Sequence, residues 1–129
     1  MTITTFCIFI VLFIAPSLYQ RIHYKLKPEH FYTLRLRKKS GLQIHHAHWG
    51  LLYILISSMW LIFAEKNMWI VLLAGLGWGL LCDEIIPHLK MPSDDRAHEL
   101  KVYVESTRPT IILLAILVGS FTALFFVLH

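Results

Sequence analysis

Four apolar runs, each long enough to cross a lipid bilayer as a helix, constrain this chain of 129 residues more than any other feature. A hydrocarbon core ~30 Å thick needs about 17 to 25 apolar helical residues, and each run reaches that length. The composition agrees, because 57% of the residues are hydrophobic and only 16% are charged. We therefore predict an all-α integral membrane protein that forms one transmembrane domain over residues 1–129, a four-helix bundle. The predicted spans are 3–19, 44–64, 68–86 and 110–128.

Local signals define the ends of these runs. Pro87 is expected to end the third span at Ile86, because proline lacks a backbone donor and clashes with the preceding turn. The first run is expected to be a retained anchor rather than a cleaved signal peptide, because no Lys or Arg precedes it and no Ala-x-Ala-like site follows it. Cys7 and Cys82 fall near opposite ends of their helices, which excludes a disulfide between them on geometric grounds.

Basic residues divide the connections between the spans into two classes. Of the twelve Lys and Arg residues, seven lie in residues 20–43 and four in residues 87–108, whereas the turn at 65–67 has only Lys66. The positive-inside rule places the side with the excess of basic residues in the cytoplasm. The protein is therefore expected in the cell inner (plasma) membrane, with both termini outside and both long connections inside.

Ionisable residues of the spans gather at the cytoplasmic end. They are three histidines at the start of the second span and two adjacent carboxylates near the end of the third: His45, His46, His48, Asp83 and Glu84. The three-residue turn at 65–67 makes these spans an antiparallel hairpin, so the two groups are expected at the same depth. Because an ionisable side chain within an apolar span is costly, a functional cluster is the first hypothesis.

A close helix contact is expected to bring these groups together. Gly75 and Gly79 form a ridge of small residues that another helix can approach, and Asp83 continues that face one turn later. His45 and His48, three residues apart, share one helix face. Imidazole nitrogen and carboxylate oxygen are ligands that suit zinc or iron. We therefore expect a divalent transition metal, zinc or iron, bound by His45, His48 and Asp83, with Glu84, His88 or His46 as a further ligand or a supporting group.

Two alternatives remain open for the same residues. In the first, the histidines are hydrated, and Asp83 and Glu84 bond to them or to the bases of the connections without any metal. In the second, two histidines hold a haem, which requires His23 or His88 to face His48 from another helix.

Two sequence motifs flank the predicted hairpin. One opens a span and the other closes the next: His45-His46-x-His48-x-Gly50 and Gly75-x-Gly77-x-Gly79-x-x-x-Asp83-Glu84. The pair resembles a group of uncharacterised small prokaryotic integral membrane proteins, in which a His-His pair opens one helix and a glycine-rich run ending in Asp-Glu closes the next. The resemblance implies that the two motifs belong together, and it implies no activity.

The function expected from a metal site is an enzyme that transforms a lipid or another amphiphile at the cytoplasmic leaflet. The metal would activate water or dioxygen, with Glu84 as the proton acceptor and His46 as the second candidate catalytic residue. A non-catalytic membrane subunit, or a sensor of metal or pH, is the alternative. An ion transporter is less favoured because ionisable groups occur at only one end of the spans, and an aspartyl protease because both carboxylates share one helix.

The connections indicate what the protein contacts. Residues 20–43 interleave aromatic with basic residues, which fits anionic lipid headgroups, whereas a nucleic-acid partner is less economical beside a membrane. The glycine ridges favour a homo-oligomer or a place in a larger membrane complex. A short helix beginning near residues 92–95 would fold over the cluster and bring His98 and Glu99 beside it, although a solvated surface is the simpler interpretation.

Overall fold

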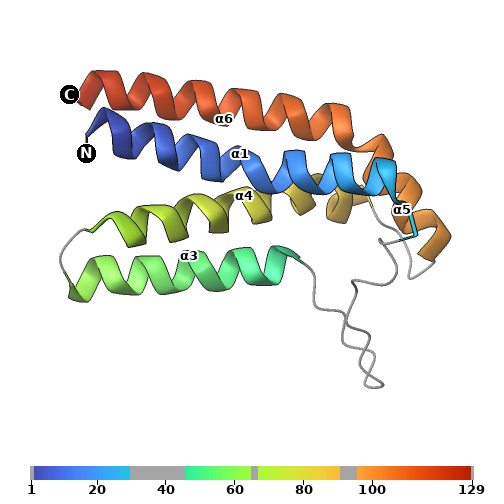
Figure 1. Cartoon of the computed structure of the whole chain (residues 1–129), viewed down its shortest axis with the longest axis horizontal. Coiled ribbons are helices and arrows are strands. Elements are labelled where there is room, and N and C mark those ends of the chain that lie inside the picture. Colours follow the sequence, from blue (N-terminus) through green and yellow to red (C-terminus); the bar gives the residue numbers. More distant parts are fainter. Residues whose placement is uncertain (1, 30–45, 65–66, 91–95, 129) are drawn as a thin grey trace.

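The computed structural model describes residues 2–29, 46–64, 67–90 and 96–128, with the side chains of residues 96–99 excepted. Every regular segment within these ranges is an α-helix, and none is a strand. The helices are α1 (Ile3–Leu26), α3 (His46–Phe63), α4 (Met68–Lys90), α5 (Arg96–Glu105) and α6 (Thr107–Leu128) (Figure 1). The prediction of an all-α fold is confirmed for this part of the chain.

Four of the described helices, α1, α3, α4 and α6, are long and apolar enough to cross a membrane, as a multi-pass membrane protein requires. They correspond to the four predicted spans. The remaining helix, α5, has ten residues and is too short to cross a membrane.

The end of the third span differs from the prediction. Helix α4 continues through Pro87 to Lys90 instead of ending at Ile86. A proline removes only one backbone N–H, and a neighbouring helix can supply another donor to the carbonyl that is left over. Helix α1 is also longer than predicted and ends at Leu26. This extension places Arg21 within a helix instead of in the basic connection of residues 20–43.

Helix α4 is the centre of the bundle. It packs against α3 along one side and against α1 along the other, whereas α6 makes fewer contacts with α1 and α4 (Figure 1). Successive spans run in opposite directions, so both termini, the end of α3 and the start of α4 lie at one end of the bundle. Helix α5 lies at the other end, with the end of α4 and the starts of α3 and α6.

Glycines allow α4 to approach both neighbours closely. A Cβ at Gly77 would lie 2.9 Å from the carbonyl oxygen of Gly50 in α3, and a Cβ at Gly50 would lie 2.7 Å from that of Gly77. On the α1 side, a Cβ at Gly79 would overlap the carbonyl group of Phe13. These positions leave no room for a side chain, so the helices meet backbone to backbone.

Phenylalanines attach α6 to α1. Phe121 of α6 packs edge-on against Phe9 and Phe13 of α1, with 5.6 and 5.5 Å between ring centroids. Phe13 also belongs, with Cys82 and Leu114, to a buried apolar cluster. Helix α6 is therefore held against α1 by aromatic contacts, whereas α4 is held against α1 and α3 by close backbone contacts at its glycines.

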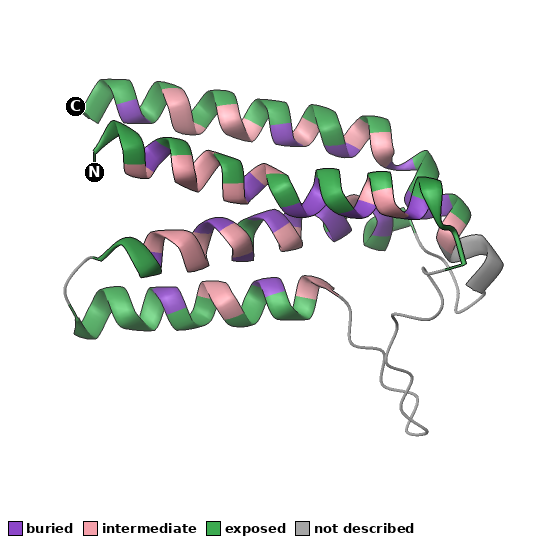
Figure 2. Cartoon of the chain, viewed as in Figure 1, coloured by how far each residue is buried: buried purple, intermediate pink, exposed green. Residues whose placement is uncertain are grey.

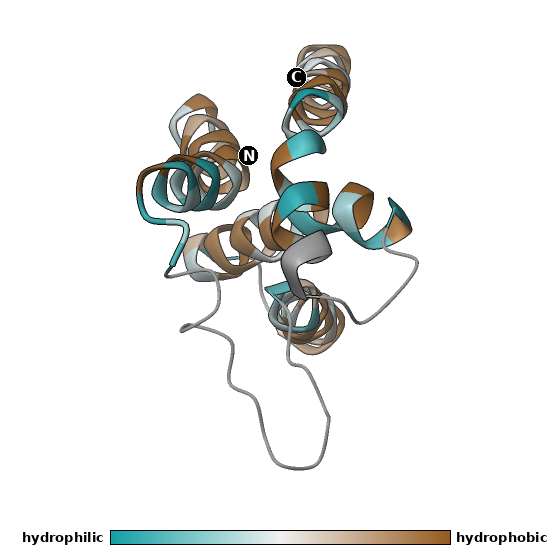
Figure 3. Ribbon diagram, turned by 90° about the vertical axis from the view of Figure 1, so that its right-hand side faces the viewer, coloured by the Kyte–Doolittle hydropathy of each residue, from teal (hydrophilic) through white to brown (hydrophobic). Residues whose placement is uncertain are grey.

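Burial and hydropathy follow the same plan. Buried residues concentrate along α4 and on α1 near the α5 end of the bundle (Figure 2). In the view from the α5 end, hydrophilic residues lie at the near ends of the helices and apolar residues make up the spans behind them (Figure 3). The polar side chains of the helices thus gather at the α5 end.

Candidate functional site

Two adjacent carboxylates on the central helix face different neighbours. Asp83 is fully buried and Glu84 is 7% exposed. Successive residues of an α-helix point about 100° apart, since one turn contains about 3.6 residues. Asp83 lies on the face that α4 turns towards α1, and Glu84 lies on the face towards α3. Each carboxylate therefore has its own partners and forms a separate site.

Arg21 of α1 is the centre of the first site. Its Nε donates to the Asp83 carboxylate at 3.1 Å, and its Nη2 donates to the Asp83 backbone oxygen at 3.2 Å. Its other three N–H groups donate to the Tyr103 backbone oxygen at 3.1 Å and to the Thr107 and Thr110 hydroxyls, each at 2.9 Å. A guanidinium has five N–H donors, so all of its donors are used. We call these five residues the arginine clasp, which joins α1, α4, α5 and α6.

Tyr103 of α5 binds the second oxygen of the Asp83 carboxylate. The Tyr103 hydroxyl donates to Oδ2 at 2.5 Å, and the Arg21 guanidinium carbon lies 4.6 Å from the centroid of the Tyr103 ring. Burial first, and then the negative charge of Asp83, raise the pKa of Tyr103 above its ordinary value. The buried hydroxyl of Ser17 lies beside the same carboxylate but makes no hydrogen bond of ordinary geometry within the described residues. Both oxygens of Asp83 are therefore engaged by the fold.

Replacing Tyr103 with phenylalanine is expected to lower the free energy of unfolding by about 1.5 to 3 kcal/mol at neutral pH, the usual value for a hydrogen bond to a charged group. Because its pKa is raised in the folded state, Tyr103 contributes fully below the unfolded-state tyrosine pKa of about 10, and that contribution is lost as the pH rises further. The wild type should therefore lose stability faster than Tyr103→Phe above about pH 10. Unfolding in detergent at neutral and alkaline pH measures both effects, and equal pH slopes for the two proteins would contradict them.

His46 and Glu84 form the second site, at the start of α3. His46 Nδ1 lies 3.1 Å from Glu84 Oε1. The glutamate side chain is 10% exposed and the imidazole is 40% exposed. One turn further along α3, Gly50 meets Gly77 backbone to backbone, which brings the two helices close enough for this contact. We call this pair the His46–Glu84 dyad.

The contact with Glu84 bears on which nitrogen of the His46 ring carries a proton. An ionised carboxylate accepts a hydrogen bond from the Nδ1–H, and the neutral ring then carries its lone pair on Nε2. A histidine that acts as a general base beside a carboxylate divides the roles of its nitrogens in this way. The two residues predicted to be catalytic, Glu84 and His46, are in direct contact, while their catalytic role stays a prediction.

The predicted metal centre is not supported by the described residues. Within them, no group of three or more His, Cys, Asp or Glu side chains lies close enough to hold a metal ion. The ridge of Gly75, Gly79 and Asp83 does allow close packing, but it faces α1 rather than the histidines of α3. Asp83 consequently meets Arg21, and each of its carboxylate oxygens accepts a hydrogen bond from the fold, from Arg21 and from Tyr103.

Among the other predicted ligands outside the dyad, the described residues include only His48 and His88, on helices α3 and α4. His45 and the side chains of His98 and Glu99 lie outside the described residues. His48 is exposed on α3, two residues beyond the dyad histidine and therefore on the opposite side of the helix. His88 is exposed near the end of α4.

Sequence reasoning missed Arg21 and Tyr103. Arg21 was counted with the basic connection, because it follows the predicted end of the first span. A signal was present, since Phe13, Ser17 and Arg21 recur at one helix turn and face the ridge that ends at Asp83. Tyr103 had no comparable signal, because the position of α5 depends on tertiary contacts.

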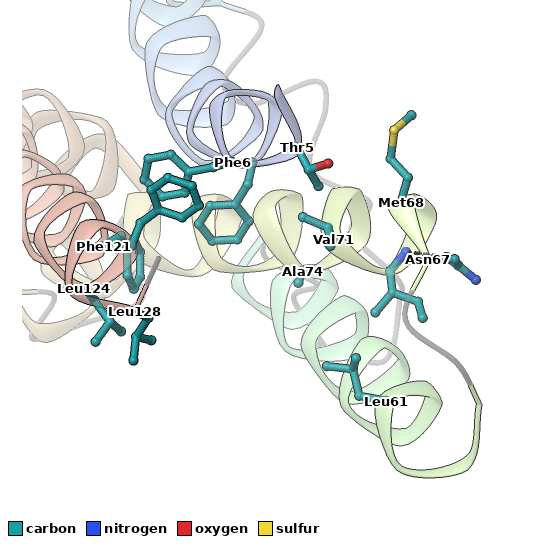
Figure 4. A pocket seen from close by; sticks show the side chains of 13 residues that line it. Thr5, Phe6, Leu61, Asn67, Met68, Val71, Ala74, Phe121, Leu124 and Leu128 are labelled. Carbon is teal, nitrogen blue, oxygen red and sulfur yellow. Dashed lines mark hydrogen bonds between the residues drawn. The ribbon is translucent and has the colours of Figure 1, made fainter. Parts of the chain in front are cut away.

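An apolar cavity of about 610 Å³ lies at the other end of the bundle (Figure 4). Helices α1, α4 and α6 line it, together with Leu61 of α3. Its polar lining residues are Thr5 and Asn67, and none of its lining residues is ionisable. It lies among the span ends near the termini, whereas the dyad lies at the α5 end. The cavity and the dyad are therefore separate features of the bundle.

No family model, no curated protein and no solved structure matches this chain. The described residues define a class by their structure: a helical protein with four candidate membrane spans. An arginine clasp joins three of these spans at one end, and a histidine–glutamate dyad joins the fourth to α4. The resemblance to small prokaryotic integral membrane proteins stays a prediction.

Proposed function

We propose that the protein is a multi-pass membrane enzyme that uses the His46–Glu84 dyad as a general base on an amphiphile. The 3.1 Å contact between His46 Nδ1 and Glu84 carries this proposal, because the carboxylate is nearly buried and the imidazole is 40% exposed. The buried partner holds the ring, and the exposed ring is accessible to a substrate. A positioned general base contributes about 10²- to 10⁴-fold to a reaction rate.

The arginine clasp supports this assignment by giving Asp83 a structural role. Asp83 is fully buried, and its two carboxylate oxygens are bound by Arg21 and Tyr103. A fully buried carboxylate that is held by an arginine and a tyrosine of the fold is not accessible to a substrate. The proposed chemistry therefore uses Glu84 rather than Asp83, and it does not invoke zinc or iron.

The position of the dyad supports an amphiphilic substrate. His46 is the first residue of α3, and Glu84 lies near the end of α4, so the dyad stands at the end of two candidate spans. Lipid headgroups occupy this level of a bilayer. We infer from the charge pattern that this end faces the cytoplasm in the plasma membrane, with both termini outside and the basic connections against anionic headgroups.

Acylation of histidine by diethyl pyrocarbonate tests the dyad without a known substrate. The reagent attacks unprotonated imidazole, so above about pH 8, well over the ordinary histidine pKa of about 6.5, the rate reports nucleophilicity and access. We expect His46 to react faster than the exposed His48. Glu84→Gln should slow the acylation of His46 severalfold, because the neutral amide no longer enriches Nε2 with electron density. Tandem mass spectrometry of protein in mild detergent measures each site.

His48 in the same protein is the internal control, and its acylation rate should be the same in the wild type and in Glu84→Gln. Circular dichroism verifies that both proteins have the same helix content. An unchanged rate at His46 in a folded Glu84→Gln protein would refute the proposed general base.

A non-catalytic, pH-sensing subunit is the second candidate, within a homo-oligomer or a larger membrane complex. The observation that favours it is that the apolar cavity and the dyad lie at opposite ends of the bundle. Protonation of His46 would strengthen its contact with Glu84 and thereby the packing of α3 on α4. Turnover of an added amphiphile that is lost in His46→Gln distinguishes the enzyme from the sensor.

A further inference from the structure

We propose that Arg21 is a positioning residue for the His46–Glu84 dyad and acts through the peptide group that joins Asp83 to Glu84. This inference rests on the proposed function of the dyad. It begins at Pro87, on the same helix one turn beyond Asp83.

Pro87 leaves the Asp83 carbonyl without its normal helical partner. In an α-helix this carbonyl accepts from the N–H four residues later, and a proline at that position has no N–H. The pyrrolidine ring also crowds the same carbonyl and tilts it away from the helix axis. Inside a membrane span, a freed carbonyl needs another donor, and neighbouring helices commonly supply it.

Arg21 of α1 supplies that donor. Its Nη2 donates to the Asp83 backbone oxygen at 3.2 Å, while its Nε donates to the Asp83 carboxylate at 3.1 Å. One guanidinium is thus hydrogen-bonded to both the backbone and the side chain of Asp83. The carbonyl that accepts from Arg21 belongs to the peptide group between Asp83 and Glu84. This planar group extends to the Cα of Glu84. The orientation of this peptide plane sets the direction in which the Glu84 side chain projects from α4.

The guanidinium is itself fixed by other helices. Nη1 donates to the Tyr103 backbone oxygen and to the Thr107 hydroxyl, and Nη2 also donates to the Thr110 hydroxyl. Its side chain is only 7% exposed. Helices α5 and α6 therefore hold the group that sets the peptide of α4, and Glu84 reaches His46 from a rigid position.

Arg21 lies on the α1 side of α4 and bonds Asp83, whereas the dyad lies on the α3 side. Its effect on His46 is consequently indirect, which makes it a positioning residue rather than a catalytic one. A lysine at this position keeps the charge but has a single terminal nitrogen, which cannot hold carboxylate and carbonyl in the same planar fork.

The test compares the acylation rate of His46 with that of His48 by diethyl pyrocarbonate above about pH 8. Arg21→Lys should lower the His46-to-His48 ratio towards the value found for Glu84→Gln. Adding Pro87→Ala to Arg21→Lys should raise the ratio again, because the new backbone N–H satisfies the Asp83 carbonyl within the helix. Alanine in place of a helical proline also raises general stability. Pro87→Ala in the wild-type background is therefore the control, and it should raise the free energy of unfolding while leaving the ratio unchanged. Lys25→Met removes an exposed positive charge one turn further along α1 and should leave the ratio unchanged.

A folded Arg21→Lys protein with the wild-type ratio, or the absence of rescue by Pro87→Ala, would overturn this inference. If Arg21→Lys does not fold, the test uses the double variant Thr107→Val with Thr110→Val. This variant removes the hydrogen bonds of the guanidinium to α6 and keeps its ion pair with Asp83. An unchanged ratio would then overturn the inference. The proposed function has its own test: it is refuted if Glu84→Gln leaves the His46-to-His48 ratio unchanged.

Discussion

Asp83→Ala is expected to lower the free energy of unfolding by about 3 to 5 kcal/mol, the usual cost of breaking a buried ion pair by removing one partner. Arg21 would keep its charge in a site where its side chain is only 7% exposed, and the Tyr103 hydroxyl would lose its acceptor. Unfolding by denaturant or heat in detergent micelles measures the loss. In Arg21→Met combined with Asp83→Leu, much of the stability should return, because a hydrophobic pair of similar volume leaves no buried charge unpaired.

The control is a solvent-exposed ion pair within one helix. Lys101 and Glu105 of α5 are 3.9 Å apart, with side chains 69% and 60% exposed. Glu105→Ala should change the free energy of unfolding by less than about 0.5 kcal/mol, because solvent screens an exposed helical pair. An Asp83→Ala protein that loses no more stability than Glu105→Ala would contradict the structural role of the arginine clasp.

Gly79→Ala is expected to destabilise the protein by about 3 kcal/mol, the upper part of the range for an overpacked core. The added Cβ would overlap the carbonyl group of Phe13, and a backbone cannot turn aside as a flexible side chain does. Helices α1 and α4 would have to separate at this point. The separation would also lengthen the contact of Arg21 with Asp83, which lies one turn further along the same face. Unfolding in detergent measures the loss.

Gly119 of α6 is the matched control for this substitution. A Cβ there would meet nothing within 4 Å among the described residues. Gly119→Ala should leave stability unchanged or raise it by up to about 1 kcal/mol, because alanine loses less backbone entropy in a helix than glycine does. Equal losses for Gly79→Ala and Gly119→Ala would show that α1 and α4 do not meet at Gly79.

The candidate site could be predicted in part because close packing and polarity both have local signatures. The small residues Gly75 and Gly79 predicted a helix contact that leads to Asp83, and the structure has that contact. The partner was wrong, because a ridge indicates that a helix approaches but not which helix. The contact of His46 with Glu84 was within reach of the sequence, since the hairpin of α3 and α4 brings the ends of adjacent spans to one level.

The boundaries of the helices were predicted less well where tertiary contacts override local preference. Pro87 is a helix breaker by propensity, yet α4 continues past it because Arg21 of α1 donates to the carbonyl left without a partner. The hydropathy of α1 falls after the apolar run, yet α1 extends to Leu26, with Arg21 and Tyr24 buried against α5. Neither compensation is visible in a local window of sequence.

The sequence by itself determined that the chain forms four apolar helices with most of its basic residues at one end, because span length, hydropathy and charge are properties of consecutive residues. Only the tertiary structure decided which helix each carboxylate meets. Asp83 and Glu84 point about 100° apart, so a modest rotation of α4 about its axis would exchange their partners. The glycine contacts with α1 and α3 set that rotation. As a result, Asp83 contacts Arg21 of the arginine clasp and Glu84 contacts His46.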